Sequence, residues 1–471
     1  MGLVEKAKNV FLESSAGLSA RASASYGSAP RPPGPTALLG VRNYLAMYRE
    51  GLDFFTRIAR EHGDIAWVKM AGRHAFLLSH PEHIEHLLLR HNADLIKDIP
   101  TRSLSRAVGQ GLVTSDGDLW RSHRKLVSFA FTPRRIKRYG DAMLAVARRS
   151  LARWRDGATI DAHAEMSRLT LEVVARVLFG ADVEHHADTV ARSVSAFNDF
   201  FTYSPVALLD LPDWTPTPRT RRFRAGMRAI DEILYGMIAA HRARGLSDDL
   251  LSALIEARDD EDTSAAFTDR ELRDQCITMF IAGHETTSLA LVYSLYFLSL
   301  HPDMEARFHR ELDSVVGAGP VTVDAAKNLS FTERVVKEAM RILPPVWGIG
   351  REAIRPFELA GYRVPAGTQL VMCQWVVHRD ARWFPDPLRF DPDRFVPDLV
   401  KHRPRMAYFP FGAGARICIG NHFAMLEAVL LLALIGQKYR LRSAPDQRLE
   451  FTPSVTLQPK HGGWQMRVRK R

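Results

Sequence analysis

The sequence contains little cysteine and no long uninterrupted apolar run. Its three cysteines, Cys276, Cys373 and Cys418, lie far apart in 471 residues, so they exclude a disulfide framework and suit a reducing compartment. No apolar run reaches the roughly 18 residues that a spanning helix needs, because residues such as Glu285 and Glu427 interrupt the longest candidates. We therefore expect no membrane span and a cytoplasmic location.

The sequence also lacks the aromatic-interleaved basic segments of a nucleic-acid-binding module. It has 64 Lys and Arg against 53 Asp and Glu, a formal net charge of +11, but the excess is largely arginine dispersed along predicted helices. We therefore expect no nucleic-acid partner, and an acidic protein is a better match for the positive charge. The hydrophobic fraction of 46% is enough for a sizeable core.

The N-terminal region differs in composition from the rest of the chain. Residues 1–29 mix Ser, Ala and Gly with a few charges, and residues 30–35 form a stiff proline-rich linker. The leader is either a disordered extension or a weak targeting peptide with an amphipathic helix, and no anchor is expected before the linker. We therefore assign residues 1–35 to a leader and linker, and residues 36–471 to a single catalytic domain.

Hydrophobic periodicity predicts a mainly α fold with a small β-rich lobe, an α+β architecture. We expect helices over 44–62, after Pro81, over much of 141–257 and over 331–342. Short strands are predicted at 65–70, 74–78, 357–364, 369–377 and within 451–468, and a loop at 97–111. Residues 211–218, which contain three prolines, interrupt the helical stretch.

The most specific segment of the sequence follows Tyr408. Six residues occur in the order F-G-x-G-x-R-x-C-x-G, which chance produces about once in a hundred thousand chains of this length: Phe411, Gly412, Gly414, Arg416, Cys418 and Gly420. The glycines allow a sharp turn close to a bound group, and the apolar helix expected from Phe423 points its N-terminal N–H groups toward the cysteine. Such a loop presents Cys418 as a thiolate ligand to a haem iron, with Phe411 shielding the sulfur and Arg416 suited to a haem propionate. The alternative is an inert buried thiol.

A second chemically unusual segment lies inside a long apolar helix. Thr268 and Glu271 form a predicted capping box, and the helix can then run without proline for roughly 50 Å. Gly283, Glu285 and Thr286 lie in its middle, where an apolar core does not accept polar groups without partners. Either these groups handle dioxygen and protons, or the Thr286 hydroxyl only bonds back to a carbonyl one turn earlier.

With both segments, the chain resembles the cytochrome P-450 superfamily of haem-thiolate monooxygenases over nearly its whole length. The string from Phe280 to Ser288 resembles the bacterial fatty-acid-hydroxylase-like branch. The resemblance implies the cytochrome P-450 fold, haem b (iron protoporphyrin IX) as cofactor and a bacterial source. It assigns Cys418 as the axial iron ligand, Gly283 as space for oxygen, and Glu285 with Thr286 as a proton relay. Haem propionates would contact the side chains of Trp120, Arg124, Arg351 and Arg416.

Three further groups of residues match this family. Glu338, Arg341 and Arg394 resemble its buried Glu-Arg-Arg network, which braces the cysteine loop. The implied substrate pocket includes the side chains of Ala282, Val346, Trp347 and Leu457. Residues 211–218 resemble the connection between two lid helices over this pocket.

The resemblance implies a monooxygenase that inserts one oxygen atom from dioxygen into an unactivated C–H bond or alkene. The substrate would be hydrophobic, such as a fatty acid, terpenoid, steroid or polyketide. The alternatives are a peroxide-driven haem peroxygenase and a non-catalytic haem-binding protein, neither of which needs the relay of Glu285 and Thr286. The sequence shows no flavin or ferredoxin module, so electrons are expected from a separate NAD(P)H-dependent redox chain.

A basic segment is the expected docking surface for an acidic ferredoxin or flavodoxin-type reductase partner. Basic side chains crowd residues 125–138, and three more follow at residues 401–405: Lys125, Arg134, Arg135, Lys137, Arg138, Lys401, Arg403 and Arg405. The alternative, which the sequence favours equally, is an ordinary solvated helix face.

Overall fold

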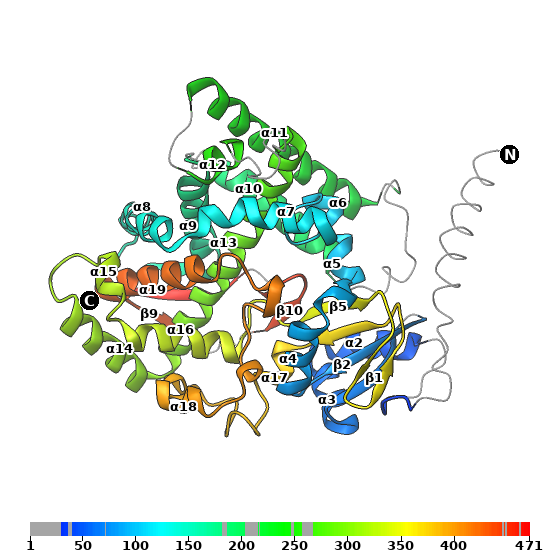
Figure 1. The fold of residues 1–471 in the computed structure, drawn as a ribbon. Helices are drawn as coiled ribbons and strands as arrows, with labels where there is room; N and C mark the ends of the chain where they lie inside the picture. Colours follow the sequence, from blue (N-terminus) through cyan, green and yellow to red (C-terminus); the bar gives the residue numbers. More distant parts are fainter. Residues whose placement is uncertain are drawn as a thin grey trace.

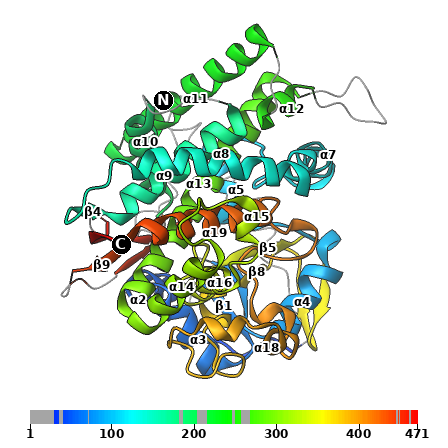
Figure 2. The same ribbon diagram turned by 90° about the vertical axis from the view of Figure 1, so that its left-hand side faces the viewer.

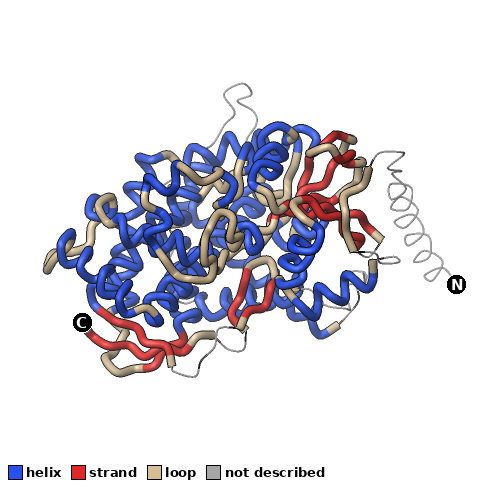
Figure 3. The backbone as a smooth tube through the Cα atoms, turned by 90° about the horizontal axis from the view of Figure 1, so that it is seen from below, coloured by secondary structure: helices blue, strands red, loops and turns tan. Residues whose placement is uncertain are grey.

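The computed structural model describes residues 30–35, 40–70, 72–180, 186–202, 215, 217–245, 249–256, 267–444, 447, 450–460 and 463–471. Within these residues, helices form one large body, and a smaller lobe beside it holds the largest sheet (Figures 1 and 3). The prediction of a mainly helical fold with a small β-rich lobe is confirmed.

The lobe is built on a five-stranded sheet with strand order β1-β2-β8-β5-β3. Its strands are β1 (Ile65–Met70), β2 (Arg73–Leu78), β3 (Leu95–Lys97), β5 (Ile349–Ala353) and β8 (Gln369–Met372). β8 pairs with β2 in parallel, whereas the other neighbours are antiparallel. Helices α2 (Val41–Glu50) and α3 (Asp53–His62) pack against β1. The lobe therefore joins segments from both halves of the chain around an apolar core that includes Phe76 and Leu370.

The other helices follow one another along the chain. They are α4 (Pro81–Arg90), α5 (Ile99–Ser103), α6 (Ser105–Val108), α7 (Gly117–Ser128), α8 (Pro133–Leu151), α9 (Ala162–Phe179), α10 (Ala187–Phe201), α11 (Pro218–Arg244), α12 (Leu250–Glu256), α13 (Asp269–Leu300), α14 (Pro302–Val315), α15 (Val323–Ala326), α16 (Ser330–Ile342), α17 (Gln374–Val377), α18 (Pro397–Lys401) and α19 (Asn421–Lys438).

The longest of these helices, α13, passes through the middle of the helical body (Figures 1 and 2). It begins with the predicted capping box: Glu271 N–H donates to Thr268 Oγ1 (3.3 Å), and Thr268 N–H donates to the Glu271 carboxylate (2.9 Å). Helices α9, α16 and α19 pack against it, so most of its side chains are buried. This surround explains why its sequence is apolar on nearly every face.

The described residues also form three smaller sheets. β4 (Thr159–Asp161), β12 (Gln465–Lys470) and β9 (Tyr439–Ser443) form one, and β6 (Phe357–Leu359) pairs with β7 (Tyr362–Val364). The third is the hairpin of β10 (Phe451–Pro453) and β11 (Leu457–Pro459). The Tyr293 hydroxyl of α13 donates to the Leu457 carbonyl, so this hairpin is fixed to the central helix.

The structure corrects several predicted boundaries. The predicted helix over 44–62 is two helices, because Gly51 adopts φ 60° and ψ −128° and ends α2. The predicted loop at 97–111 contains the short helices α5 and α6, and the predicted strand over 369–377 ends at Met372, where α17 follows one residue later. Residues 1–29 and most of the turn at 211–218 lie outside the described residues.

The proline-rich segment lies against the lobe. Trp67 N–H donates to the Pro33 carbonyl (2.8 Å), and the Arg31 guanidinium lies 4.0 Å from the centre of the Trp67 ring. Residues 31–33 therefore pack along β1 and are not a free spacer. In the part of the chain that the structure describes, no helix is both long and apolar enough to cross a membrane.

Candidate active site

The loop before α19 holds Cys418 in a fixed turn. The Cys418 N–H donates to the Phe411 carbonyl (2.9 Å), and Phe411 packs partly buried against the main core. Gly412 and Gly414 both have positive φ, 69° and 68°, and a Cβ at Gly414 would lie 2.4 Å from the Leu88 carbonyl of α4. Only glycine satisfies both conditions at residue 414, which explains its presence in the motif.

The sulfur of Cys418 has the surroundings of a stabilised thiolate. Burial raises the pKa of the Cys418 thiol, while the Gly420 N–H and the nearby Arg124 charge act to lower it. Cys418 keeps an accessible surface. A thiol in this position is open to a ligand, unlike the fully buried Cys276 and Cys373.

A cluster of charged side chains lies beside this loop: Lys97, Arg124, Arg351, Arg416, Asp98 and Asp116. Burial beside Arg351 and Arg416 lowers the pKa of Lys97 to about 7, and burial lowers the pKa of Arg416 to about 10. The basic groups outnumber the carboxylates, so the cluster carries an excess of positive charge. Such crowding of like charge is relieved by a bound dianion, and haem b carries two propionates.

Two of the predicted propionate ligands, Arg416 and Trp120, contact each other. Arg416 donates to the Ser115 carbonyl (2.9 Å), pairs with Asp116 and lies 3.8 Å from the centre of the buried Trp120 ring. Trp120 therefore packs against Arg416. The positive charge of Arg124 lies close enough to Cys418 to favour its thiolate form. Lys97, at the end of β3, was missed by sequence reasoning because a single lysine in a predicted loop gives no local signal.

The middle of α13 borders open space on one side. Ala282 is exposed and Gly283 and Thr286 are half-buried, whereas their neighbours in the helix are buried. The Thr286 hydroxyl donates to the Ala282 carbonyl (2.8 Å), as the structural interpretation of this threonine expects. A Cβ at Gly283 would lie 3.1 Å from Val174 of α9, so this glycine also allows α9 and α13 to approach closely.

His284 and Glu285 point into the protein interior. His284 Nδ1 bonds to the Phe280 carbonyl (2.6 Å), and burial lowers its pKa to about 4, so it is a neutral structural side chain. Burial raises the pKa of Glu285 to about 7. Its carboxyl accepts hydrogen bonds from Asn198 and Thr456, at 2.8 and 3.0 Å. A carboxyl that exchanges its proton near neutral pH suits acid–base chemistry.

The three residues of the predicted charged network lie together. Arg341 donates to both Glu338 oxygens (2.7 and 2.8 Å) and to the His378 carbonyl (2.8 Å), and all of these groups are fully buried. Arg394 Nε lies 3.4 Å from Glu338, too poorly aligned for a hydrogen bond, while its Nη2 donates to the Asp386 carbonyl. The network ties α16 to the segment that leads into the cysteine loop.

Two of the predicted pocket residues, Trp347 and Leu457, join the β10–β11 hairpin to the segment after Pro345. Trp347 is buried and donates to the Ser454 carbonyl (2.9 Å), and Leu457 N–H donates to the Pro345 carbonyl (2.8 Å). Leu457 is fully buried, Val346 is half-buried and Ala282 is exposed. Of the predicted pocket residues, Ala282 and Val346 keep accessible surface, whereas Leu457 packs inside the core.

The donor set and the charge cluster define the class of protein. An accessible Cys418, an excess of positive charge and a titratable carboxyl on the central helix fit haem b held by a cysteine thiolate. This is the site of a haem-thiolate monooxygenase.

Comparison with known proteins agrees with this assignment to the haem-thiolate monooxygenases. The family model for cytochrome P450 matches residues 31–466, so the chain belongs to the cytochrome P450 family.

Individual relatives cover most of the chain. A cyclooctatin synthase of Streptomyces melanosporofaciens is 34% identical over 433 residues, which are 90% of this chain and 92% of the relative. A pentalenene oxygenase of Streptomyces avermitilis is 35% identical over 420 residues, 88% and 91% of the two chains. The structure of retinoic acid bound cyanobacterial CYP120A1 superposes with a TM-score of 0.83 at 27% identity, covering 94% of this chain and 100% of that one.

The enzyme is therefore a cytochrome P450 monooxygenase that acts on a hydrophobic substrate. When bound, haem b would supply the oxygen-activating iron chemistry, with electrons from a separate redox chain. Cys418 is the residue of this chain suited to hold the iron, and the basic cluster is suited to hold the propionates.

Proposed function

We propose that this monooxygenase oxidises a terpenoid, that Glu285 and Thr286 supply protons to its site, and that an acidic ferredoxin or flavodoxin-type protein supplies electrons. The observation that carries the proton relay is the pair formed by a buried carboxyl with a pKa of about 7 and a hydroxyl beside the exposed Ala282. Thr286 donates to the Ala282 carbonyl and keeps oxygen lone pairs for a second hydrogen bond.

Replacement of Thr286 by Val tests the relay. The variant keeps the shape of the side chain but loses the hydroxyl, so product per nicotinamide consumed should fall while hydrogen peroxide release rises. Thr287→Val is a matched control, because Thr287 makes the same kind of bond to the Gly283 carbonyl (3.1 Å) and is buried. Product yield at the wild-type level in Thr286→Val would assign this threonine a structural role only.

The relatives support a terpenoid as the proposed substrate class. Two of them are named for cyclooctatin and pentalenene, and the exposed Ala282 offers an apolar surface on α13. A panel of cyclic terpenoids and of linear fatty acids, screened for shifts of the haem absorption band, separates the two classes. Shifts with fatty acids alone would favour the fatty-acid-hydroxylase-like alternative.

A basic surface around Phe129 suits docking of an acidic electron donor. Phe129 is 58% exposed, and the Arg135 guanidinium lies 4.4 Å from the centre of its ring. Arg134 is exposed in the first turn of α8, where the helix dipole disfavours a basic side chain. A cation at this position therefore strengthens a positive field, and the exposed ring beside it can act as an apolar anchor.

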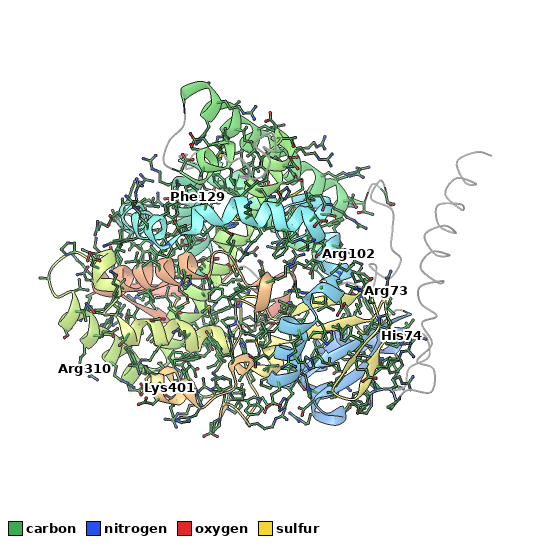
Figure 4. All side chains as sticks on the ribbon, viewed as in Figure 1. Arg73, His74, Arg102, Phe129, Arg310 and Lys401 are labelled. Carbon is green, nitrogen blue, oxygen red and sulfur yellow. The ribbon has the colours of Figure 1, made fainter. Side chains whose placement is uncertain are left out.

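Two residues of the wider predicted surface make their contacts away from Phe129. Arg403 is half-buried, donates to the Arg394 carbonyl and lies 4.2 Å from the centre of the Phe384 ring, so its role is structural. Lys401 pairs with Asp398 and lies far from Phe129 in Figure 4. We therefore centre the proposed docking surface on α7 and α8.

Charge reversal tests this surface. Arg134→Glu should slow electron transfer from an acidic ferredoxin, most strongly at low ionic strength, where screening is weak. Arg310→Glu makes the same change in net charge on α14, distant from Phe129 in Figure 4, and should leave the rate unchanged. Equal rates for both variants across a salt series would exclude this surface.

We also propose that residues 36–471 form one catalytic domain in the bacterial cytoplasm. If the proposal holds, a chain starting at residue 36 still folds and binds haem, while one starting at residue 30 unfolds at a higher temperature because residues 31–33 contact β1. Thermal unfolding of the two truncated chains, each with haem, tests the domain boundary, and cell fractionation tests the location.

A further inference from the structure

A cluster of polar side chains surrounds Glu285 in an otherwise apolar interior. Glu285, Asn198 and Thr456 are 3%, 5% and 4% exposed. Their hydrogen bonds join three elements, because Asn198 lies on α10, Glu285 on α13 and Thr456 immediately before β11. A third donor, Gln458 of β11, also contacts the carboxyl.

All three donors converge on one oxygen of the carboxyl. Asn198 Nδ2, Thr456 Oγ1 and Gln458 Nε2 each donate to Glu285 Oε1. Among the residues that the structure describes, Oε2 receives no hydrogen bond from another side chain. Donors to Oε1 stabilise the carboxylate and burial destabilises it, so the pKa settles at about 7. The cluster must therefore accommodate both protonation states.

The Asn198 amide can form a hydrogen bond with Glu285 whether the carboxyl is protonated or ionised. In this structure its Nδ2 donates to the carboxyl, while its Oδ1 is buried without a hydrogen-bond partner among the described residues. A buried oxygen without a partner is costly. If Glu285 holds its proton on Oε1, a rotation of the Asn198 amide by half a turn presents Oδ1 as an acceptor for that proton. The same amide then bonds to the carboxyl in either state.

The backbone of Asn198 is fixed as well. Its carbonyl accepts hydrogen bonds from Thr202 Oγ1 (2.7 Å) and from Ser454 Oγ (3.0 Å). The backbone carbonyl of Ser454 accepts a hydrogen bond from Trp347 Nε1. A movement of α10 relative to the β10–β11 hairpin would therefore change the hydrogen bonds that Glu285 receives.

We propose that Asn198 is a positioning residue for proton supply, whose amide bonds to the Glu285 carboxyl in both protonation states and couples it to the position of α10. This inference rests on the proposed relay role of Glu285. Asn198 does not transfer the proton itself, because an amide does not release a proton near neutral pH.

The other titratable groups around the carboxyl keep one charge state near neutrality. Tyr293 faces it from α13, and burial raises the phenol pKa well above its usual range. His284, the preceding residue, is neutral because burial lowers its pKa to about 4. Among the described residues of the cluster, Glu285 is thus the group that titrates.

Replacement of Asn198 by Leu or Asp tests the proposal in the haem-loaded enzyme. Leu removes both hydrogen-bonding functions at nearly the same size, and Asp keeps the acceptor but not the amide donor. Ser193→Ala is the control on α10, because the Ser193 hydroxyl donates to the Thr189 carbonyl of the same helix (2.8 Å) and, among the described residues, to no other group. An infrared titration of the buried carboxyl, with Glu285→Gln as the blank, reports its protonation directly.

The expected shift follows from the lost donor. In Asn198→Leu the carboxyl should titrate about one to two pH units higher than in the wild type, and in Asn198→Asp higher still because a second carboxyl lies beside it. Peroxide released per dioxygen consumed, measured without organic substrate, should rise in both variants. Ser193→Ala should match the wild type in both measurements.

Two outcomes separate the proposal from its premise. A wild-type titration and peroxide yield in both Asn198 variants would overturn the positioning role. A wild-type peroxide yield in Glu285→Gln would instead refute the relay role of Glu285, whatever the Asn198 variants do. If Asn198→Leu does not bind haem, Asn198→Asp, which is isosteric, carries the test.

Discussion

Glu427 should make the enzyme less stable as the pH rises. It lies in α19 and is fully buried, and neither carboxyl oxygen has a hydrogen-bond partner among the described residues. Burial therefore raises the pKa of Glu427 well above its usual range. The carboxyl is neutral in the folded protein at neutral pH, whereas it ionises freely once the chain unfolds.

The sign and size of the effect follow from proton linkage. Above about pH 4.5, the unfolded chain releases a proton that the folded chain retains, so the stabilisation present below that pH is lost as the pH rises toward the folded pKa. The slope is about 1.4 kcal/mol per pH unit. Between pH 5.5 and 7.5, Glu427 thus lowers the free energy of unfolding by about 2.7 kcal/mol.

Urea unfolding of the haem-loaded enzyme, followed by circular dichroism at several pH values, measures this loss. In Glu427→Gln and Glu427→Met, the loss of unfolding free energy between pH 5.5 and 7.5 should be smaller by about 2.7 kcal/mol. Other buried carboxyls titrate alike in every variant, so they do not contribute to this difference. Glu358→Gln, at an exposed site of β6, should keep the wild-type slope. Parallel curves for wild type and Glu427→Gln would show that the carboxyl is ionised in the folded state and would refute the reasoning.

Two further predictions concern the cysteine loop and its support. Cys418→Ala should abolish the thiolate signature in the absorption spectrum of the reduced carbon monoxide complex, and an unchanged spectrum would rule out Cys418 as the ligand. Arg341→Met leaves the fully buried Glu338 without its main partner, so it should cost about 3 to 5 kcal/mol of unfolding free energy. The double variant Glu338→Leu with Arg341→Leu should cost less than the sum of the single changes, and additive losses would contradict the pairing.

The sequence alone predicted the role of the cysteine loop and determined the course of the central helix. Gly414 and Cys418 belong to one short motif, and the capping box at Thr268 and the absence of proline set the limits of α13. Glu338 and Arg341 are one turn apart on one helix. In each case the interacting residues are near in sequence, so backbone geometry relates them directly.

Only the tertiary structure decided which distant side chains meet. Asn198 and Thr456 lie 87 and 171 residues from Glu285, and periodicity reports which face of an element is buried but not what packs against it. Lys97 joined the charge cluster for the same reason, and Arg403 packed on Phe384 although it belongs to a basic run. These outcomes depend on the packing of whole elements, which fixes burial and therefore the charge state and partners of each polar group.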